Sequence, residues 1–399
     1  MPRFEPFRGL RYDPDRVPLA RVVAPPYDVI SPDERMALQA QSPYNSVRIE
    51  LPDEDPGLDR YEAAARRIAD WRAEGILRQD ITERLYGYRM TYLDEAGHRR
   101  RTIGVIGALG LEPPGTAGIF PHERTTPKAK SDRLQLLQAT RVNTSPIWGL
   151  SLARGLSEAL ESPVRFDRVT DAEGIEHELW PIIDPAAIAW ISQAVSDAPV
   201  VIADGHHRFE TALNYQGQRR AAGADSPGSQ DSVMALVVEL AEDQLSVQAI
   251  HRLIGGLPAD FDLVGALGGY FELTPTEAPD ATILERMAGN DSLALVTPGG
   301  TWLLHPRPET TAAARQDLDS SRLEVALAAL PEHELVYQHH WDLASGAVDR
   351  GEAQAAVLLR PVTVEQIAST GRGGERMPPK STFFWPKPRT GFVFREVAG

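Results

Sequence analysis

Apolar and polar positions follow two different periods along the chain, one typical of helices and one typical of strands. Ser31-Pro32-Asp33-Glu34 combines a capping serine, a proline suited to the first helical turn and an acidic residue three positions on, so it predicts a helix through Gln41. A second helix is predicted over 59–74, because apolar residues recur there near helical spacing and Gly75 follows. Further helices are predicted from Ser131 or Asp132 to Val142, over 186–195 and over 312–330.

Strand-like segments lie between these helices. Two β-hairpins are predicted around short polar turns that end in glycine, one from 85–93 with 101–109 and one from 165–170 with 175–182. The continuous apolar run 233–240 is typical of a central strand. This mixture predicts an α+β or mixed α/β fold with mixed sheets rather than a doubly wound parallel sheet.

A chain of 399 residues is long enough for two domains. We expect a boundary near 255–260, which gives a first region of 1–257 and an accessory α/β region of 258–399. The C-terminal segment 377–397 returns to strand-like character and is a candidate to pack back on the first region.

Composition narrows the classes of function. The 41 Lys and Arg against 56 Asp and Glu give a net charge of −15, which disfavours extended contact with nucleic acid or an anionic membrane. The absence of cysteine excludes disulfides, thiolate catalysis and zinc held by cysteine. No apolar stretch approaches the ~20 residues of a membrane span, and residues 1–6 carry no signal-peptide core, so the expected location is the cytoplasm.

The densest chemistry lies in 200–213, V-V-I-A-D-G-H-H-R-F-E-T-A-L. A short apolar strand ends at Asp204, and a turn at Gly205 opens into a helix. A helix start attracts anions through its unpaired N–H groups and dipole, and the end of a strand is where open sheets commonly bind ligands. The first turn adds polar side chains from His206, His207 and Arg208. We interpret the segment as a phosphate-binding turn with an acid beside it, the alternative being an ordinary capped turn with solvated histidines.

The polar segment 121–133, P-H-E-R-T-T-P-K-A-K-S-D-R, is the second candidate. As the general base, Glu123 would accept a proton from a substrate hydroxyl, while Lys128, Lys130 or Arg133 would neutralise phosphates, and His122 would contact the substrate. A solvated charged loop is the alternative.

Three further places contribute candidates. Pro25-Pro26-Tyr27-Asp28 is either a rigid turn or a means of aiming Tyr27 and Asp28 at a substrate. Residues 374–381 are not a P-loop, because Pro379 stands where the second glycine is required. The remaining candidates are Lys380, Ser381 and Thr382 for phosphate, and His251 and Arg252 for the substrate.

Five motifs in order along the chain resemble one family. They are P-P-Y-D-V at 25–29, H-E-R-T at 122–125, A-D-G-H-H-R-F-E-T-A-L at 203–213, H-R-L at 251–253 and P-K-S-T-F-F-W-P-K at 379–387. Together they look like the domain of unknown function 1015 family, some of whose members are regarded as free L-serine kinases, and the D-G-H-H-R turn is similar to that of the ParB/sulfiredoxin-like superfamily.

The resemblance implies a ParB/sulfiredoxin-like nucleotide-binding core with insertions within 1–257. It implies transfer of a phosphoryl group from ATP or ADP, with Mg²⁺, to a small hydroxyl substrate such as L-serine, giving O-phosphoserine. Gly205, His206, His207 and Arg208 would then hold nucleotide phosphates, with Asp204 and Glu123 near the substrate hydroxyl. Asp204 would orient the hydroxyl or help hold Mg²⁺.

The sequence leaves two other classes of function open. A metal-dependent hydrolase would use Asp204, His206 and His207, with His122 or Glu123, around Zn²⁺ or Mn²⁺, although adjacent helical histidines point about 100° apart. A non-catalytic nucleotide or nucleic-acid binder is the third class, which the negative charge disfavours. The expected partners are therefore a nucleotide and a small hydroxyl substrate, with no membrane.

Overall fold

The computed structural model describes residues 2–94, 97–113, 116, 118–121, 127–160, 166–224, 227–373, 377–378 and 380–397, with the backbone alone at 121, 127–130 and 371–373. The chain forms two compact units: unit 1, residues 1–246 with 386–399, and unit 2, residues 247–385. The chain leaves unit 1 at Ser246, whereas the sequence analysis placed a boundary at 257. Residues 386–397 belong to unit 1, and residues 377–385 belong to unit 2.

Unit 1 contains a nine-stranded mixed sheet in the order β6-β11-β8-β12-β5-β4-β10-β9, with β1 paired to β5. Its strands are β1 (Phe4–Glu5), β4 (Leu85–Leu93), β5 (Arg99–Gly110), β6 (Ile119–Pro121), β8 (Ile147–Ser151), β9 (Asp167–Thr170), β10 (Glu176–Ile182), β11 (Val200–Asp204) and β12 (Ser232–Glu239). The pairs β11–β6 and β12–β8 are parallel and the other pairs along the sheet are antiparallel. The expected α+β fold with mixed sheets is thereby confirmed.

A smaller sheet of unit 1 joins distant parts of the chain in the order β3-β2-β21-β7. Its strands are β2 (Gly9–Tyr12), β3 (Leu77–Gln79), β7 (Val142–Asn143) and β21 (Phe394–Glu396). The C-terminal strand β21 lies between two strands made much earlier in the sequence. It pairs through Phe394 with Leu10 and through Glu396 with Val142.

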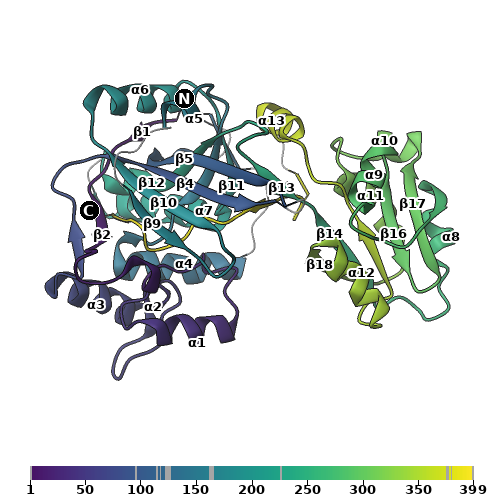
Figure 1. Ribbon diagram of the computed structural model, residues 1–399, viewed down its shortest axis with the longest axis horizontal. Helices are drawn as coiled ribbons and strands as arrows, with labels where there is room; N and C mark the ends of the chain where they lie inside the picture. Colours follow the sequence, from purple (N-terminus) through teal and green to yellow (C-terminus); the bar gives the residue numbers. More distant parts are fainter. Residues whose placement is uncertain are drawn as a thin grey trace. The chain divides into compact units, whose positions relative to one another are not determined.

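The helices of unit 1 are α1 (Pro32–Gln41), α2 (Val47–Glu50), α3 (Arg60–Ala73), α4 (Pro127–Thr140), α5 (Leu156–Ala159), α6 (Pro185–Ser196) and α7 (His206–Ala221), with 3-10 turns at Leu19–Arg21 and Ser229–Asp231. In Figure 1, α5 and α6 lie above the large sheet and α1 to α4 below it. The main core packs strand residues such as Val200, Ile202 and Val237 against Phe209 of α7 and Ile191 of α6. This core holds β11 and α7, and therefore the turn between them, in place.

Unit 2 contains a six-stranded antiparallel sheet in the order β15-β17-β16-β19-β14-β18 and a two-stranded sheet of β13 and β20. The strands are β13 (Ser246–Gln248), β14 (Ile250–Gly255), β15 (Phe271–Thr276), β16 (Leu293–Thr297), β17 (Gly300–Pro306), β18 (Glu334–His339), β19 (Ala355–Leu358) and β20 (Phe383–Trp385). The helices are α8 (Leu263–Leu267), α9 (Ile283–Gly289), α10 (Pro308–Ala313), α11 (Asp319–Leu327), α12 (Trp341–Asp349) and α13 (Val364–Gly373).

The structure confirms several elements that local sequence signals predict, and it shows that two elements were predicted wrongly. The helix starts at Ser31 and Asp59 and both β-hairpins are as predicted. The start of α4 was wrong, because the helix begins at Pro127, where proline fits the first turn, so Ser131 and Asp132 lie inside it. The single helix over 312–330 was also wrong: the backbone at Ala314 is extended, and α11 begins at Asp319, whose carboxylate binds Arg360.

Candidate functional site

The turn from β11 to α7 carries the site. Residues 200–203 are buried between β6 and β8, and the register against β8 shifts between Ile202 and Asp204. Such a bulge re-aims the side chain that follows it. Gly205 then takes a φ of 83°, a conformation that glycine adopts without strain, and α7 begins at His206 with no side chain capping it. The sequence therefore delivers Asp204 and an uncapped helix start to the same corner.

Two cations hold Asp204. Lys387 Nζ lies 2.8 Å from Asp204 Oδ1, and Arg208 Nη2 donates to Oδ2 at 3.1 Å. Burial opposes ionisation of this carboxyl group, but Lys387 and Arg208 outweigh burial and hold the pKa of Asp204 well below its ordinary value. Asp204 is therefore a permanently charged carboxylate near neutral pH, and a weak base.

Arg208 is held from its other side by backbone and hydroxyl oxygens. Its Nη1 donates to Ser145 Oγ at 3.0 Å and to the carbonyl oxygen of Pro146 at 2.5 Å. Ser145 Oγ in turn donates to Glu50 Oε1 at 2.9 Å, and Glu50 is only 1% exposed. A chain of hydrogen bonds therefore runs from a buried carboxylate through Ser145 and Arg208 to Asp204.

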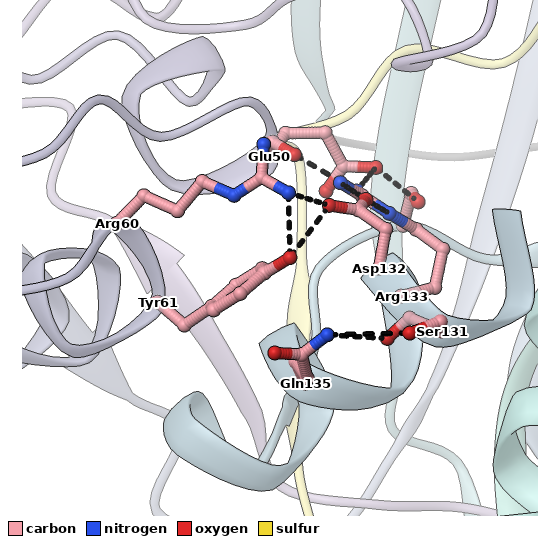
Figure 2. Close-up of polar contacts among 8 residues, drawn as sticks. Glu50, Arg60, Tyr61, Ser131, Asp132, Arg133 and Gln135 are labelled. Carbon is pink, nitrogen blue, oxygen red and sulfur yellow. Dashed lines mark hydrogen bonds and ion pairs between the residues drawn. The ribbon is translucent and has the colours of Figure 1, made fainter. Parts of the chain in front are cut away.

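Arg133 joins the backbone of Glu50 to a second acid. Its Nη1 donates to the carbonyl oxygen of Glu50 at 2.8 Å, and its Nε donates to Asp132 Oδ2 at 2.8 Å. Figure 2 shows Arg60 and Tyr61 of α3 converging on the same Asp132, with distances to Oδ1 of 2.7 Å and 2.9 Å. The network ties α2, α3 and α4 together beside the site. It leaves Arg133, at 6% exposure, engaged within the protein.

A small cavity of about 40 Å³ adjoins the network, and its lining includes Glu50, Arg133, Arg208 and Thr211. Within the described part of the chain, Glu50 Oε2, Arg208 Nε and Thr211 Oγ1 are buried polar atoms without a hydrogen-bond partner. A volume of this size with both donors and acceptors in its lining fits one or two ordered water molecules.

Tyr27 and Asp28 stand at the edge of the cluster. The Arg133 guanidinium lies 4.2 Å from the centre of the Tyr27 ring, a cation–π contact. Burial raises the pKa of Tyr27 to about 12, with Arg208 opposing, so its hydroxyl stays protonated. Asp28 is exposed, and it interacts electrostatically with Asp204, Arg208 and Lys387.

The segment that carries Lys387 is anchored two residues further on. Arg389 pairs with Asp171 through both Nε, at 3.1 Å, and Nη2, and its backbone N–H donates to the Tyr88 hydroxyl at 3.0 Å. His177, fully buried, bridges Tyr88 and Asp171 with distances of 2.9 Å and 3.0 Å. Burial lowers the pKa of His177, so this bridge is a neutral imidazole. The anchor fixes the backbone on which Lys387 reaches Asp204.

The structure gathers only part of the residues that the sequence singled out. Unit 1 brings together Tyr27, Asp28, Arg133, Asp204, Gly205, His206, His207 and Arg208. His206 is 8% exposed, which excludes a solvated face for that imidazole. His122 and Glu123 lie outside the described residues, as do the side chains of Lys128 and Lys130, whose backbone belongs to α4.

The other five candidates belong to unit 2, where most of them bind neighbouring groups. His251 Nδ1 accepts the backbone N–H of Leu359, and Arg252 donates to the carbonyl oxygens of Ile250 and Lys380. Ser381 contacts Ser320 and the Pro378 carbonyl oxygen, and Thr382 is buried. Lys380 is exposed and has a φ of 58°.

Sequence reasoning missed Lys387, Ser145 and Glu50 as members of the site. Lys387 is 183 positions from Asp204. Its only signal was its place in the basic and aromatic run 379–387 near the C-terminus. Ser145 and Glu50 are single residues outside any motif, and only the fold brings them to Arg208.

The side chains of the described residues do not form a binding site for a transition metal. Within the described ranges, no group of three or more histidine and acidic side chains is placed to hold a metal ion. Both oxygens of Asp204 are already bound by cations. The hydrolase hypothesis therefore finds no ligand set among these residues.

In the same described ranges, no helix has the length and apolar character needed to cross a membrane.

Gly205 offers a direct test of the turn. A Cβ there would lie 3.1 Å from Arg208 Nε, Arg208 Nη2 and Ile147 Cα while the backbone kept its left-handed conformation. We expect Gly205→Ala to lower the free energy of unfolding by about 1–3 kcal/mol. The matched control is Gly217→Ala in the same helix, where a Cβ meets nothing within 4 Å, and it should raise stability by about 0.5–1 kcal/mol. Urea unfolding of both variants measures the difference, and equal effects would contradict the proposed strain.

The fold and the site define an α+β protein in which a strand-to-helix turn presents a carboxylate between an arginine and a lysine. Residues 4–325 match the family model described as protein of unknown function, DUF1015. The chain belongs to that family. No curated protein matches the chain.

Comparison with solved structures gives distant similarities. A free serine kinase in complex with AMP aligns at 15% identity and a TM-score of 0.38, covering 74% of this chain and 91% of that one. A conserved hypothetical protein from Pyrococcus furiosus aligns at 14% identity and a TM-score of 0.37, and the alignment covers 73% of this chain and 93% of that one. SbnI with a C-terminal truncation, from Staphylococcus aureus, aligns at 12% identity and a TM-score of 0.38, and the alignment covers 72% of this chain and 85% of that one.

Proposed function

We propose that this protein is a small-molecule kinase that transfers a phosphoryl group from ATP or ADP to a hydroxyl substrate, with free L-serine as the first candidate acceptor. The observation that carries the proposal is the ion cluster at the start of α7, where Asp204 lies between Lys387 and Arg208. The motif resemblance at 203–213 supports the same activity.

The cluster suits phosphoryl transfer for an electrostatic reason. The transferred group spreads negative charge over its oxygens, so the protein mainly has to position reactants and stabilise that charge. The uncapped start of α7 offers backbone N–H groups, and Lys387 and Arg208 add fixed positive charge. Asp204 is ionised and bound by both cations, and its proposed role is to orient an acceptor hydroxyl.

Magnesium fits this site as the companion of the nucleotide. Because both oxygens of Asp204 are engaged, the described residues favour an ion that arrives on the phosphates rather than one held by the protein alone. Bound there, Mg²⁺ would neutralise phosphate oxygens. His206 and His207, with Lys128 and Lys130, are the protein groups proposed to contact the phosphates, whereas Arg133 is engaged within the protein, and Glu123 is the base that the sequence predicts.

The test is a transfer assay on the full chain. The protein is incubated with Mg²⁺, ATP or ADP, and a panel of L-serine, L-threonine and small polyols, and the products are identified by mass spectrometry. We expect one acceptor to gain a phosphate in proportion to the nucleotide consumed, and no such product when the acceptor is omitted. Phosphate release without acceptor phosphorylation, or no nucleotide turnover with any acceptor, would contradict a kinase.

A further inference from the structure

Arg208 has few hydrogen-bond donors left for a ligand. A guanidinium group carries five N–H donors in one plane, two on each Nη atom and one on Nε. Both N–H groups of Nη1 are used, one by Ser145 Oγ at 3.0 Å and one by the carbonyl oxygen of Pro146 at 2.5 Å. One N–H of Nη2 donates to Asp204 Oδ2 at 3.1 Å, and Nε is buried. Among the described residues, the second N–H of Nη2 is therefore the donor that remains for a ligand.

This set of contacts excludes a two-pronged bond between Arg208 and a phosphate group. An arginine that binds phosphate through two parallel hydrogen bonds needs two neighbouring nitrogens with available N–H groups. In Arg208 both donors of Nη1 are engaged within the protein and Nε is buried. A single N–H donates well over a narrow range of directions, so its value to a ligand depends on how the guanidinium plane is turned.

Ser145 helps to decide how that plane is turned. The hydrogen bonds to Pro146 and Asp204 hold two corners of the guanidinium group, and two held points still allow rotation about the line that joins them. The hydrogen bond to Ser145 Oγ leaves Nη1 in another direction and opposes this rotation. Ser145 and Pro146 directly precede β8, and β8 pairs with β11, whose last residue is Asp204. The three contacts therefore come from two strand ends that the large sheet holds in register.

Glu50 determines the role of the Ser145 hydroxyl. A hydroxyl group carries one hydrogen, and a guanidinium group can only donate, so Ser145 accepts from Arg208. Ser145 donates its own hydrogen to Glu50 Oε1 at 2.9 Å, which leaves a lone pair of the hydroxyl oxygen for Nη1 of Arg208. Glu50 is 1% exposed, and its carbonyl oxygen accepts a hydrogen bond from Arg133 Nη1 at 2.8 Å. The acceptor that orients Ser145 is therefore itself held in the protein interior.

We propose that Ser145 and Glu50 are positioning residues of the site, which turn the Arg208 guanidinium so that one N–H of Nη2 meets a single phosphate oxygen of the nucleotide. The assignment rests on the proposed kinase function. Ser145 acts on Arg208 directly, and Glu50 acts through Ser145. Neither residue is assigned a contact with the reacting atoms, so their loss weakens the binding of the nucleotide more than the transfer step itself.

The first experiment compares Ser145→Ala with Ser145→Thr, which keeps the hydroxyl group. With the active donor and acceptor, Ser145→Ala should raise the nucleotide KM about 5-fold or more and change kcat by less than about 3-fold, because the Arg208 contact is made before and during transfer. Ser145→Thr should bring the nucleotide KM back to within about 3-fold of the wild type. A smaller rise in Ser145→Ala, or no recovery in Ser145→Thr, would overturn the role of Ser145.

Val233→Ala is the matched control for a purely structural effect. Val233 is 2% exposed and lines the same small cavity as Ser145 with an apolar side chain. Its truncation should lower the urea midpoint of unfolding at least as much as Ser145→Ala does, while the nucleotide KM stays within about 2-fold of the wild type. If the KM of this control rises as much as that of Ser145→Ala, the loss of binding is a general loss of structure, and the positioning role is overturned.

A double-variant comparison tests whether Glu50 acts through Ser145. Glu50→Gln replaces a carboxylate by a neutral amide of the same size and should raise the nucleotide KM about 2-fold or more in the wild-type background. In the Ser145→Ala background the same change should have no further effect on KM, because the link to Arg208 is already missing. A smaller effect in the wild-type background, or equal effects in the two backgrounds, would overturn the role of Glu50.

A measurement on the free protein separates the positioning of Arg208 from the kinase function. In nitrogen NMR spectra of the arginine side chains, the two Nη signals of Arg208, assigned with the help of Arg208→Lys, should be resolved in the wild type, because the hydrogen bonds restrict rotation of the guanidinium group. In Ser145→Ala they should broaden or merge. Unresolved signals in the wild type, or unchanged signals in the variant, would overturn the positioning whatever the activity. If the signals change as expected but no acceptor gains a phosphate, the kinase function and the role in nucleotide binding fail, whereas the orientation of Arg208 by Ser145 stands.

Discussion

Replacement of Asp204 by asparagine is expected to lower phosphotransfer turnover by about 100-fold or more. Asparagine keeps the size of the side chain and one acceptor oxygen but loses the charge that Lys387 and Arg208 bind. Those two cations would then lack this counter-charge, so the arrangement proposed for the phosphates and for the hydroxyl would be disturbed together. Effects of 10²–10³ are typical when one preorganised polar group of a site is removed.

The same variant has a second, measurable consequence for stability. Breaking a fully buried ion pair costs about 3–5 kcal/mol, and partial solvent access at Asp204 and Lys387 reduces the cost here to roughly 2 kcal/mol. Steady-state kinetics and urea unfolding are measured on the same preparations. Asp349→Asn, an exposed aspartate at the end of α12, is the matched control and should leave both values unchanged. Full turnover of Asp204→Asn at saturating nucleotide would contradict the role assigned to this carboxylate.

Asp171→Asn is expected to destabilise the protein in a pH-dependent manner. Burial opposes ionisation of Asp171, but hydrogen bonds from His177 and Arg389 and the charge of Arg389 hold its pKa well below the ordinary 3.8. A depressed carboxyl pKa contributes stability that is complete above the unfolded pKa and is lost as pH falls through the folded pKa. The free energy of unfolding of the wild type should therefore exceed that of Asp171→Asn by about 2–4 kcal/mol near pH 7. This difference should shrink progressively below about pH 4.

Denaturant unfolding between pH 7 and pH 3 measures this difference. Subtracting the free energy of unfolding of the variant from that of the wild type removes the contribution of all other carboxylates, since both proteins carry them. Asp349→Asn should follow the wild type at every pH. A wild-type advantage that stayed constant down to pH 3 would show that Asp171 does not act through its charge. Because Arg389 anchors the segment that carries Lys387, the variant should also weaken nucleotide binding without touching the site itself.

Elements with a local cause were predictable from the sequence. The α1 start needs only Ser31 Oγ accepting the Glu34 N–H at 3.2 Å, and α3 begins with a full capping box at Asp59. The hairpins follow from short glycine-containing turns between alternating strands. The interruption between α10 and α11 had no local signal, because Arg360, forty-one positions on, binds Asp319 at the start of the second helix.

The same division applies to the site. Asp204, Gly205 and Arg208 lie within one short segment of the sequence. The strand, turn and helix start predicted there were therefore enough to bring them together. Lys387, Ser145 and Glu50 reach the cluster from three other parts of the chain. Side-chain hydrogen bonds at such separations follow from the tertiary arrangement of the sheet, which periodicity does not encode.

The position of β21 has a consequence for how the protein matures on the ribosome. The strands on either side of it, β2 and β7, are translated long before residues 394–396 emerge, and Lys387 emerges only shortly ahead of them. Until those residues emerge, the smaller sheet lacks the strand that joins β2 to β7, and Asp204 lacks the lysine that binds its Oδ1. A chain that stops before residue 386 should therefore lack both features.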